Sequence, residues 1–200
     1  MSGMKSRSLV NQIIHILSYA LMNRNDYYTN KAIEFLRRMN IHYGFIIVRN
    51  YNKEDFPQFG IAASIGLSGF GIIFIEKSFF EYRKIPEKLK EFIIAHEVAH
   101  VVRNHVIFNL LTKVLFRISF EAILENIIKA NKLLELVINF LLGSITLITE
   151  IKIDMEVIKR QEPEADNIAI QLAGYEGALH FVKMLETLKK KGIDVSHEVN

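Results

Sequence analysis

The feature that most constrains the fold is a change of hydrophobic periodicity along the chain. Segments rich in β-branched and aromatic residues, which strands prefer, occur only at Phe45–Val48, Ile61–Ile65 and Gly71–Glu76. From Pro86 to about Lys190 the apolar residues recur at helical spacing instead. A short run of strands followed by a long helical half predicts an α+β domain, with a small antiparallel or mixed sheet and a mainly helical remainder.

The length of 200 residues suits one domain, and 50% hydrophobic residues are enough for a buried core. Residues 1–28 predict an N-terminal amphipathic helix, because apolar residues recur there at helical spacing. A second short helix is expected over 29–40, with Thr29 as its N-cap. We therefore expect the main domain at 29–190 and a C-terminal tail at 191–200.

Two apolar segments, 106–120 and 136–149, predict an apolar helical insertion at about 106–150. The second would be about 21 Å long as a helix, shorter than a bilayer core of about 30 Å. Lys113 and Arg117 give the first a basic edge. This lobe could lie at a membrane surface or bury its apolar face in a homo-oligomer, and both interpretations stay open.

Composition excludes several kinds of chemistry. The chain has no cysteine, so disulfides, thiolate metal sites and cysteine nucleophiles are excluded. The lack of cysteine suits a reducing compartment, and we expect a cytoplasmic protein, with membrane association left open. The formal net charge is only +3, and the 25 basic residues are scattered rather than gathered in a stripe. We therefore expect no nucleic-acid partner.

The strongest chemical signal is His96-Glu97-Val-Ala-His100. Residues four apart on a helix share one face, so the two imidazoles can converge on one Zn²⁺. Glu97 lies about 100° further round the helix, where it can reach a metal-bound water without binding the metal. That is the place for a general base, which makes Glu97 the candidate catalytic residue.

Two histidines leave a catalytic zinc site one protein ligand short. The best further cluster is Glu162-Pro-Glu-Ala-Asp166, in which Glu162 and Asp166 are four apart and share a helix face. One carboxylate could bind the metal while the other accepts a ring N–H from a ligand histidine. The alternative is an acidic first helical turn with Pro163 at its first position, and the spacing alone does not decide between them.

With these motifs the chain resembles the M48-type gluzincin metallopeptidases, a group that includes the compact soluble minigluzincins. The resemblance rests on Phe92–His100, on His105 shortly after it, and on Glu162–Asp166. The stretches Phe59–Ser64 and Gly71–Phe80 also resemble the edge strand and the following strand and turn of that family. The similarity spans roughly residues 30–190 and implies a zincin-like metallopeptidase domain.

The resemblance implies one Zn²⁺ per chain, held by His96, His100 and Glu162, with Glu97 as catalytic base and Asp166 as the partner of a ligand histidine. Pro163 departs from the pattern, because proline directly after a ligand is unusual inside a helix. Either the helix begins there or it kinks. Glu164 is therefore kept as a substitute third ligand.

The predicted activity is that of a zinc-dependent endopeptidase acting on protein or peptide substrates. An extended substrate would add to the edge strand along Ile61, Ala62, Ala63 and Ser64. The motifs do not identify an oxyanion-stabilising residue. Tyr175 and His180 are the candidates further along the chain, with ordinary packing or surface roles favoured for both.

Two other interpretations compete. A non-catalytic membrane-associated or assembly protein would carry a structural or vestigial metal in a closed four-ligand site. His105 is the obvious fourth ligand, but it lies nine residues after His96 and would point about 180° away on a continuous helix. A repressor-cleaving regulator would need a DNA-binding helix-turn-helix or a sensor domain, for which the chain has no room.

Overall fold

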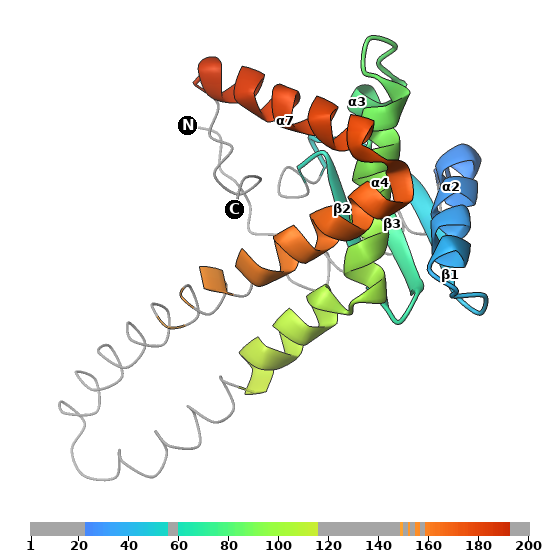
Figure 1. Ribbon diagram of the computed structural model, residues 1–200. Helices are drawn as coiled ribbons and strands as arrows, with labels where there is room; N and C mark the ends of the chain where they lie inside the picture. Colours follow the sequence, from blue (N-terminus) through green and yellow to red (C-terminus); the bar gives the residue numbers. More distant parts are fainter. Residues whose placement is uncertain are drawn as a thin grey trace, which may run out of the picture.

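The chain forms an α+β domain in a computed structural model that describes residues 23–55, 60–115, 149, 152, 155–156 and 159–192 (Figure 1). Among the described residues, one helix precedes three consecutive strands, and the elements after the strands are helices. The named elements are α2 (Asp26–Arg38), β1 (Phe45–Tyr51), β2 (Ala62–Leu67), β3 (Phe70–Glu76), α3 (Lys77–Glu81), α4 (Glu87–Val102) and α7 (Tyr175–Lys190). Residues 105–115 and 159–173 are also helical.

The three strands form one mixed sheet in the order β1-β3-β2. β3 is central, pairing in parallel with β1 and antiparallel with β2. Ser68 and Gly69 join β2 to β3 with φ angles of 50° and 90°, which is the geometry of a tight primed hairpin turn. β2 is therefore an edge strand within the described sheet, as expected for residues 62–64.

α4 is the central helix of the domain. From Leu89 to Val101 no residue of this helix is exposed, and Phe92–Ala95 is an unbroken apolar run, a pattern typical of a helix that is covered all round. It packs on the sheet through β2 and β3 and on α2 and α7 through its other faces. Ile94, Ala95, Val98 and Ala99 are all fully buried. The position of α4 is thus fixed by packing before any polar contact is considered.

α2 begins three residues earlier than the sequence suggested. Asn25 is the N-cap, and its side chain accepts a hydrogen bond from the Tyr28 backbone N–H. Thr29, the expected N-cap, is instead fully buried inside the helix. Its hydroxyl oxygen accepts a hydrogen bond from the Val48 N–H at 3.0 Å, which ties α2 to β1. The Thr29 hydroxyl therefore bonds to a neighbouring strand and does not cap its own helix.

The helical half is not continuous, because α4 ends at Val102. Asn104 has a φ of 61°, a left-handed conformation that asparagine tolerates and that ends helices. Its side-chain oxygen accepts a hydrogen bond from the Ser68 N–H in the β2–β3 turn, and its carbonyl accepts one from the Phe108 N–H. The sheet therefore holds the break in place, and a new helix starts at residue 105.

Helices 105–115 and 159–173 lie side by side, and both run towards the lower left in Figure 1. The side-chain amides of Asn109 and Gln161 exchange two hydrogen bonds, at 3.0 and 2.9 Å. At the other end Arg38 of α2 donates to the Leu172 carbonyl oxygen at 2.7 Å. Pro163 lies inside helix 159–173, so the interpretation that it opens the helix is wrong. Tertiary contacts at both ends maintain a helix that a proline would otherwise weaken.

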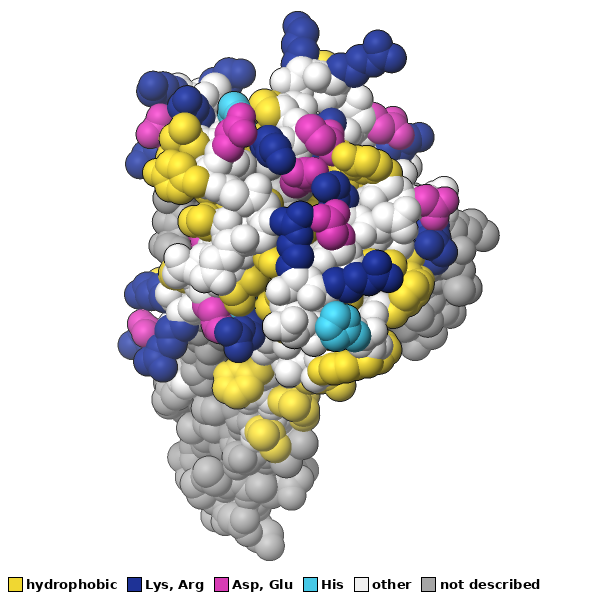
Figure 2. All heavy atoms as spheres, turned by 45° about the vertical axis from the view of Figure 1, so that its right-hand side comes forward, with side chains coloured by type: hydrophobic (Ala, Val, Ile, Leu, Met, Phe, Trp, Pro, Cys, Tyr) yellow, Lys and Arg dark blue, Asp and Glu magenta, His cyan; other side chains and the backbone are white. Residues whose placement is uncertain are grey.

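Charged side chains of both signs mix on the face that carries α2 (Figure 2). Lys31 of α2 pairs with Glu91 of α4 at 2.9 Å, and Lys88 reaches the same carboxylate at 3.1 Å. The face shown therefore carries paired charges rather than a stripe of one sign.

Several predicted segments fall on residues that are not described. These are most of the N-terminal helix at 1–28, most of the insertion at 106–150 and the tail beyond 192. Helix 105–115 is the described start of that insertion. Among the described helices, none has the length and apolar character needed to span a bilayer.

α7 crosses α4 so closely that one position has no room for a side chain. A Cβ atom on Gly177 would lie 2.5 Å from the Lys88 carbonyl oxygen and 2.7 Å from Phe92 Cβ. Both contacts are sub-van der Waals, and the first is to backbone, so the helices would have to move apart. Gly177 therefore sets the distance between α7 and the helix that carries the histidines.

We expect Gly177→Ala to destabilise the protein by about 1–3 kcal/mol through overpacking, although alanine is the better helix former. Thermal or denaturant unfolding measures the change. Glu186→Ala, an exposed change on the same helix, is the control and should alter the unfolding free energy by less than about 0.5 kcal/mol. A more stable Gly177→Ala protein would contradict this account of the crossing.

Candidate metal centre

Side chains of two helices meet at one point. α4 contributes His96 and His100, one turn apart, and helix 159–173 contributes Glu162. The two imidazole Nε2 atoms are 3.0 Å apart. The Glu162 carboxylate lies 3.2 Å from the His96 Nε2 and 3.5 Å from the His100 Nε2. The structure thus brings together the three residues that sequence analysis named as ligands.

This donor set fits Zn²⁺. Nitrogen and carboxylate ligands held at about 2.0–2.1 Å by a tetrahedral ion lie about 3.3 Å from each other, close to the spacings found here. The three side chains are only 12–28% exposed. Lone pairs that face one another out of water repel unless a cation or a proton lies between them. Within the described residues no other group of His, Asp and Glu forms such a cluster.

Asp166 orients His96. Its carboxylate lies 2.9 Å from the His96 Nδ1, so the Nδ1–H donates to it and the Nε2 is turned towards Glu162. Burial lowers the pKa of His96, but the hydrogen bonds with Asp166 and Glu162 outweigh it and raise that pKa to about 10. Burial and the neighbouring His96 lower the pKa of His100 to about 4. Without a metal, the pair therefore shares one proton near neutral pH.

His105 lies at the site, contrary to expectation. The prediction that it points away from His96 assumed a continuous helix, and the break at Arg103 and Asn104 removes that assumption. The His105 Nδ1 lies 2.9 Å from the Nδ1 of His100, on the side of that ring away from Glu162. The side chain is only 6% exposed. Asn104 was a local signal for this turn, because asparagine tolerates the left-handed conformation that ends helices, and the sequence analysis did not use it.

Glu164 is directed elsewhere. One of its carboxylate oxygens pairs with the Arg103 Nε at 2.9 Å, and the other lies 3.4 Å from the His105 Nε2. It is absent from the group formed by His96, His100 and Glu162. Of the two carboxylates left open as third ligand, the geometry favours Glu162.

A cleft with a cavity volume of about 520 Å³ opens over this cluster. Glu97 lines it beside the two histidines, and β2 lines one wall through the stretch expected to bind substrate. α7, which sequence analysis did not connect with the site, also contributes apolar residues to the lining. The lining residues include Ile61, Ala62, Ala63, Ser64, Phe92, Ile93, Phe181, Val182 and Leu185.

The comparison with protein families agrees with this site. The sequence model described as peptidase family M48 matches residues 65–190, which is more than half of the chain and contains both motifs. The chain belongs to peptidase family M48. No curated protein and no solved structure matches it. Membership makes this protein one of a family of peptidases, so protein or peptide substrates are expected for the cleft.

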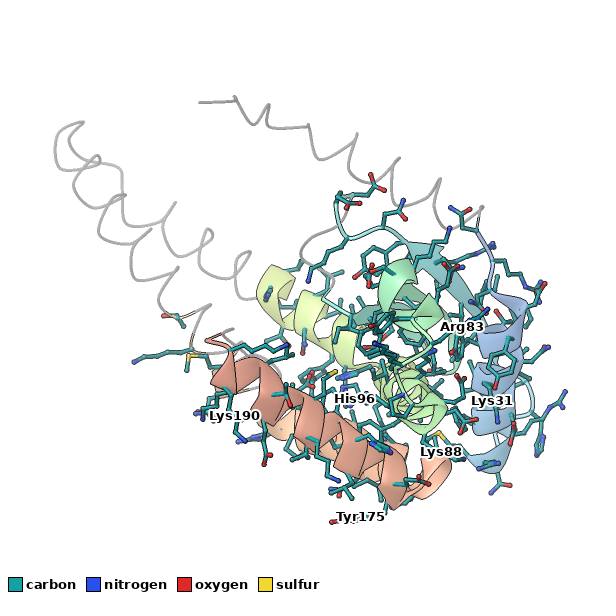
Figure 3. All side chains as sticks on the ribbon, turned by 90° about the horizontal axis from the view of Figure 1, so that it is seen from above. Lys31, Arg83, Lys88, His96, Tyr175 and Lys190 are labelled. Carbon is teal, nitrogen blue, oxygen red and sulfur yellow. The ribbon has the colours of Figure 1, made fainter. Side chains whose placement is uncertain are left out.

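The two oxyanion candidates of this M48 protein lie outside the cleft lining. Tyr175 is 71% exposed at the start of α7, and Figure 3 shows it far from His96. The His180 Nε2 lies 3.9 Å from the Glu176 carboxylate. The preference for ordinary surface roles at both positions agrees with this placement.

Zinc binding should become tighter as the pH rises. The raised pKa of His96 keeps a proton on the metal-free site, and zinc must displace that proton. We expect the apparent affinity to rise about tenfold per pH unit between pH 6 and 8, measured by competition with a chromophoric chelator. Asp166→Asn removes a group that raises this pKa and should flatten the slope. An affinity that is independent of pH in this range would contradict the proton assignment.

Proposed function

We propose that this protein is a zinc-dependent endopeptidase of zincin-like fold, in which His96, His100 and Glu162 hold the metal and Glu97 is the general base. The convergence of three inward-facing ligand atoms, reached from two separate helices, carries the proposal. Its family membership and the cleft above the cluster support it.

Each residue has a distinct task. Zinc bound there would polarise a water and the scissile carbonyl. Glu97, one residue after His96 on α4, lines the cleft and is placed to take the proton from that water and pass it to the leaving amine. Asp166 keeps the Nδ1–H of His96 oriented so that its Nε2 faces the metal.

β2 is the proposed substrate-binding strand. One of its edges pairs with β3, and residues 61–64 line the cleft next to the histidines. An extended peptide can add to a sheet edge through main-chain hydrogen bonds, which gives affinity with little sequence choice. The apolar wall formed by Phe181, Val182 and Leu185 would then select side chains.

The competing interpretation, a structural metal in a closed site, requires a fourth protein ligand. His105 was the candidate. Its contact is with the Nδ1 of His100, whereas the proposed metal lies on the Nε2 side. This arrangement favours an open coordination position and hence the peptidase.

Glu97→Gln should bind zinc as the wild type does. Its rate of proteolysis should fall by about 10²–10⁴-fold, because the amide cannot accept the proton from the water. Cleavage of a dye-quenched casein and metal analysis of the same preparation measure both properties. Glu176→Gln, an exposed carboxylate on α7, is the matched control and should remain active. Full activity in Glu97→Gln would refute the assigned role.

Glu162→Gln and Glu164→Gln separate the two candidate ligands. Loss of a residue that only hydrogen-bonds a metal ligand typically weakens metal binding by roughly 10–100-fold. We expect Glu162→Gln to weaken zinc binding by more than this, because it removes a ligand. Glu164→Gln should weaken it by less than about tenfold, because this side chain pairs with Arg103. Chelator competition gives both affinities. The reverse order would transfer the ligand role to Glu164.

A further inference from the structure

We propose that His105 is a positioning residue that fixes the ring of His100, so that the Nε2 of His100 faces the metal. This inference rests on the proposed function, in which His100 is a zinc ligand. It assigns the second ligand histidine a partner of its own, corresponding to the Asp166 carboxylate that orients His96.

The backbone between α4 and helix 105–115 brings His105 into contact with His100. α4 ends at Val102, and the left-handed Asn104 turns the chain back before helix 105–115 begins. The ring of His105 then meets the ring of His100 edge to face, with centroids 4.9 Å apart and an angle of 75° between the planes. His105 is 5% exposed as a residue, so its polar atoms need partners inside the protein.

The hydrogen positions follow from the distances. Two Nδ1 atoms 2.9 Å apart share one N–H. If the Nε2 of His100 offers its lone pair to the metal, the hydrogen of His100 is on Nδ1 and donates to His105. His105 then accepts at Nδ1 and carries its own hydrogen on Nε2, which lies 3.4 Å from the Glu164 carboxylate. The Arg103 Nε holds the other oxygen of that carboxylate.

This partner differs in charge from Asp166. His96 donates to a carboxylate, whereas His100 donates to a neutral imidazole whose own N–H leads to Glu164. Glu162, Asp166 and Glu97 already place three carboxylates around the histidines. A neutral acceptor orients His100 without adding a further negative charge in contact with the ligand set.

Two polar substitutions separate the two contacts of His105. In His105→Asn the side-chain oxygen lies where Nδ1 was and can still accept from His100. In His105→Gln the amide lies near the former Nε2 and can still donate to Glu164, but nothing accepts from His100. We expect His105→Asn to keep zinc affinity within about threefold of the wild type, and His105→Gln to lose about 10–100-fold.

The test uses the full chain and zinc alone. Chelator competition gives the zinc affinity of the wild type, the two variants and His180→Gln, which removes an imidazole outside the cleft lining and should change nothing. Nitrogen-15 NMR of the zinc-loaded proteins adds a second measurement. The hydrogen-bonded Nδ1–H signal of His100 should persist in the wild type and His105→Asn and be lost in His105→Gln.

The outcomes are distinguishable. A wild-type protein that does not bind one zinc per chain overturns the proposed function and this inference with it. A wild type that binds zinc, with equal affinities in the two variants or with His105→Gln the tighter, overturns only the role of His105. The expected order of affinities together with the expected NMR signal supports it, whatever the peptidase activity proves to be.

Discussion

Two imidazole nitrogens and the two oxygens of one carboxylate face one another at 3.0–3.5 Å in a poorly exposed part of this protein. Such an arrangement is unfavourable by itself, because lone pairs repel and burial removes the water that would separate them. A shared proton or a divalent cation relieves the repulsion. The rest of the structure can be understood as the framework that forces these atoms together.

That framework depends on α4. The helix is buried on almost all sides between the sheet and the other helices, so the positions of its two histidines follow from core packing. The helix that carries Glu162 is fixed independently, by Arg38 at its C-terminal end and by the Asn109–Gln161 amide pair near its described start. The Nδ1 atoms of the two histidine rings then form hydrogen bonds with the Asp166 carboxylate and with His105. Packing sets the backbone, and hydrogen bonds orient the rings.

The same elements form the cleft. β2 lies along one side of α4, and α7 crosses its first turns at Gly177, where no side chain fits. β2 thus offers the backbone groups of an edge strand, and α7 offers apolar side chains. In the proposed function, a bound peptide would meet unspecific contacts from the strand and selective contacts from α7.

Much of the local structure was predictable from periodicity. The α+β class, the three strands and the start of α4 near Pro86 agree with the pattern, because alternation of strand-forming residues and helical spacing reflect local geometry. Thr29, Pro163 and His105 show where such reasoning fails. The Thr29 hydroxyl bonds to a strand, and Pro163 lies inside a helix that is held at both ends. His105 lies at the site because the chain reverses at Asn104, which is hydrogen-bonded to the β2–β3 turn.

The sequence by itself determined the candidate ligand types, through its residues, and the shared face of His96 and His100, through their four-residue spacing on a helix. It could not choose between Glu162 and Glu164, nor place His105, since their positions depend on contacts between segments far apart in the chain. Only the tertiary structure decided that Glu162 faces the histidines, that Glu164 pairs with Arg103 and that His105 touches His100. The physical reason is that packing determines the direction of a side chain wherever two helices meet.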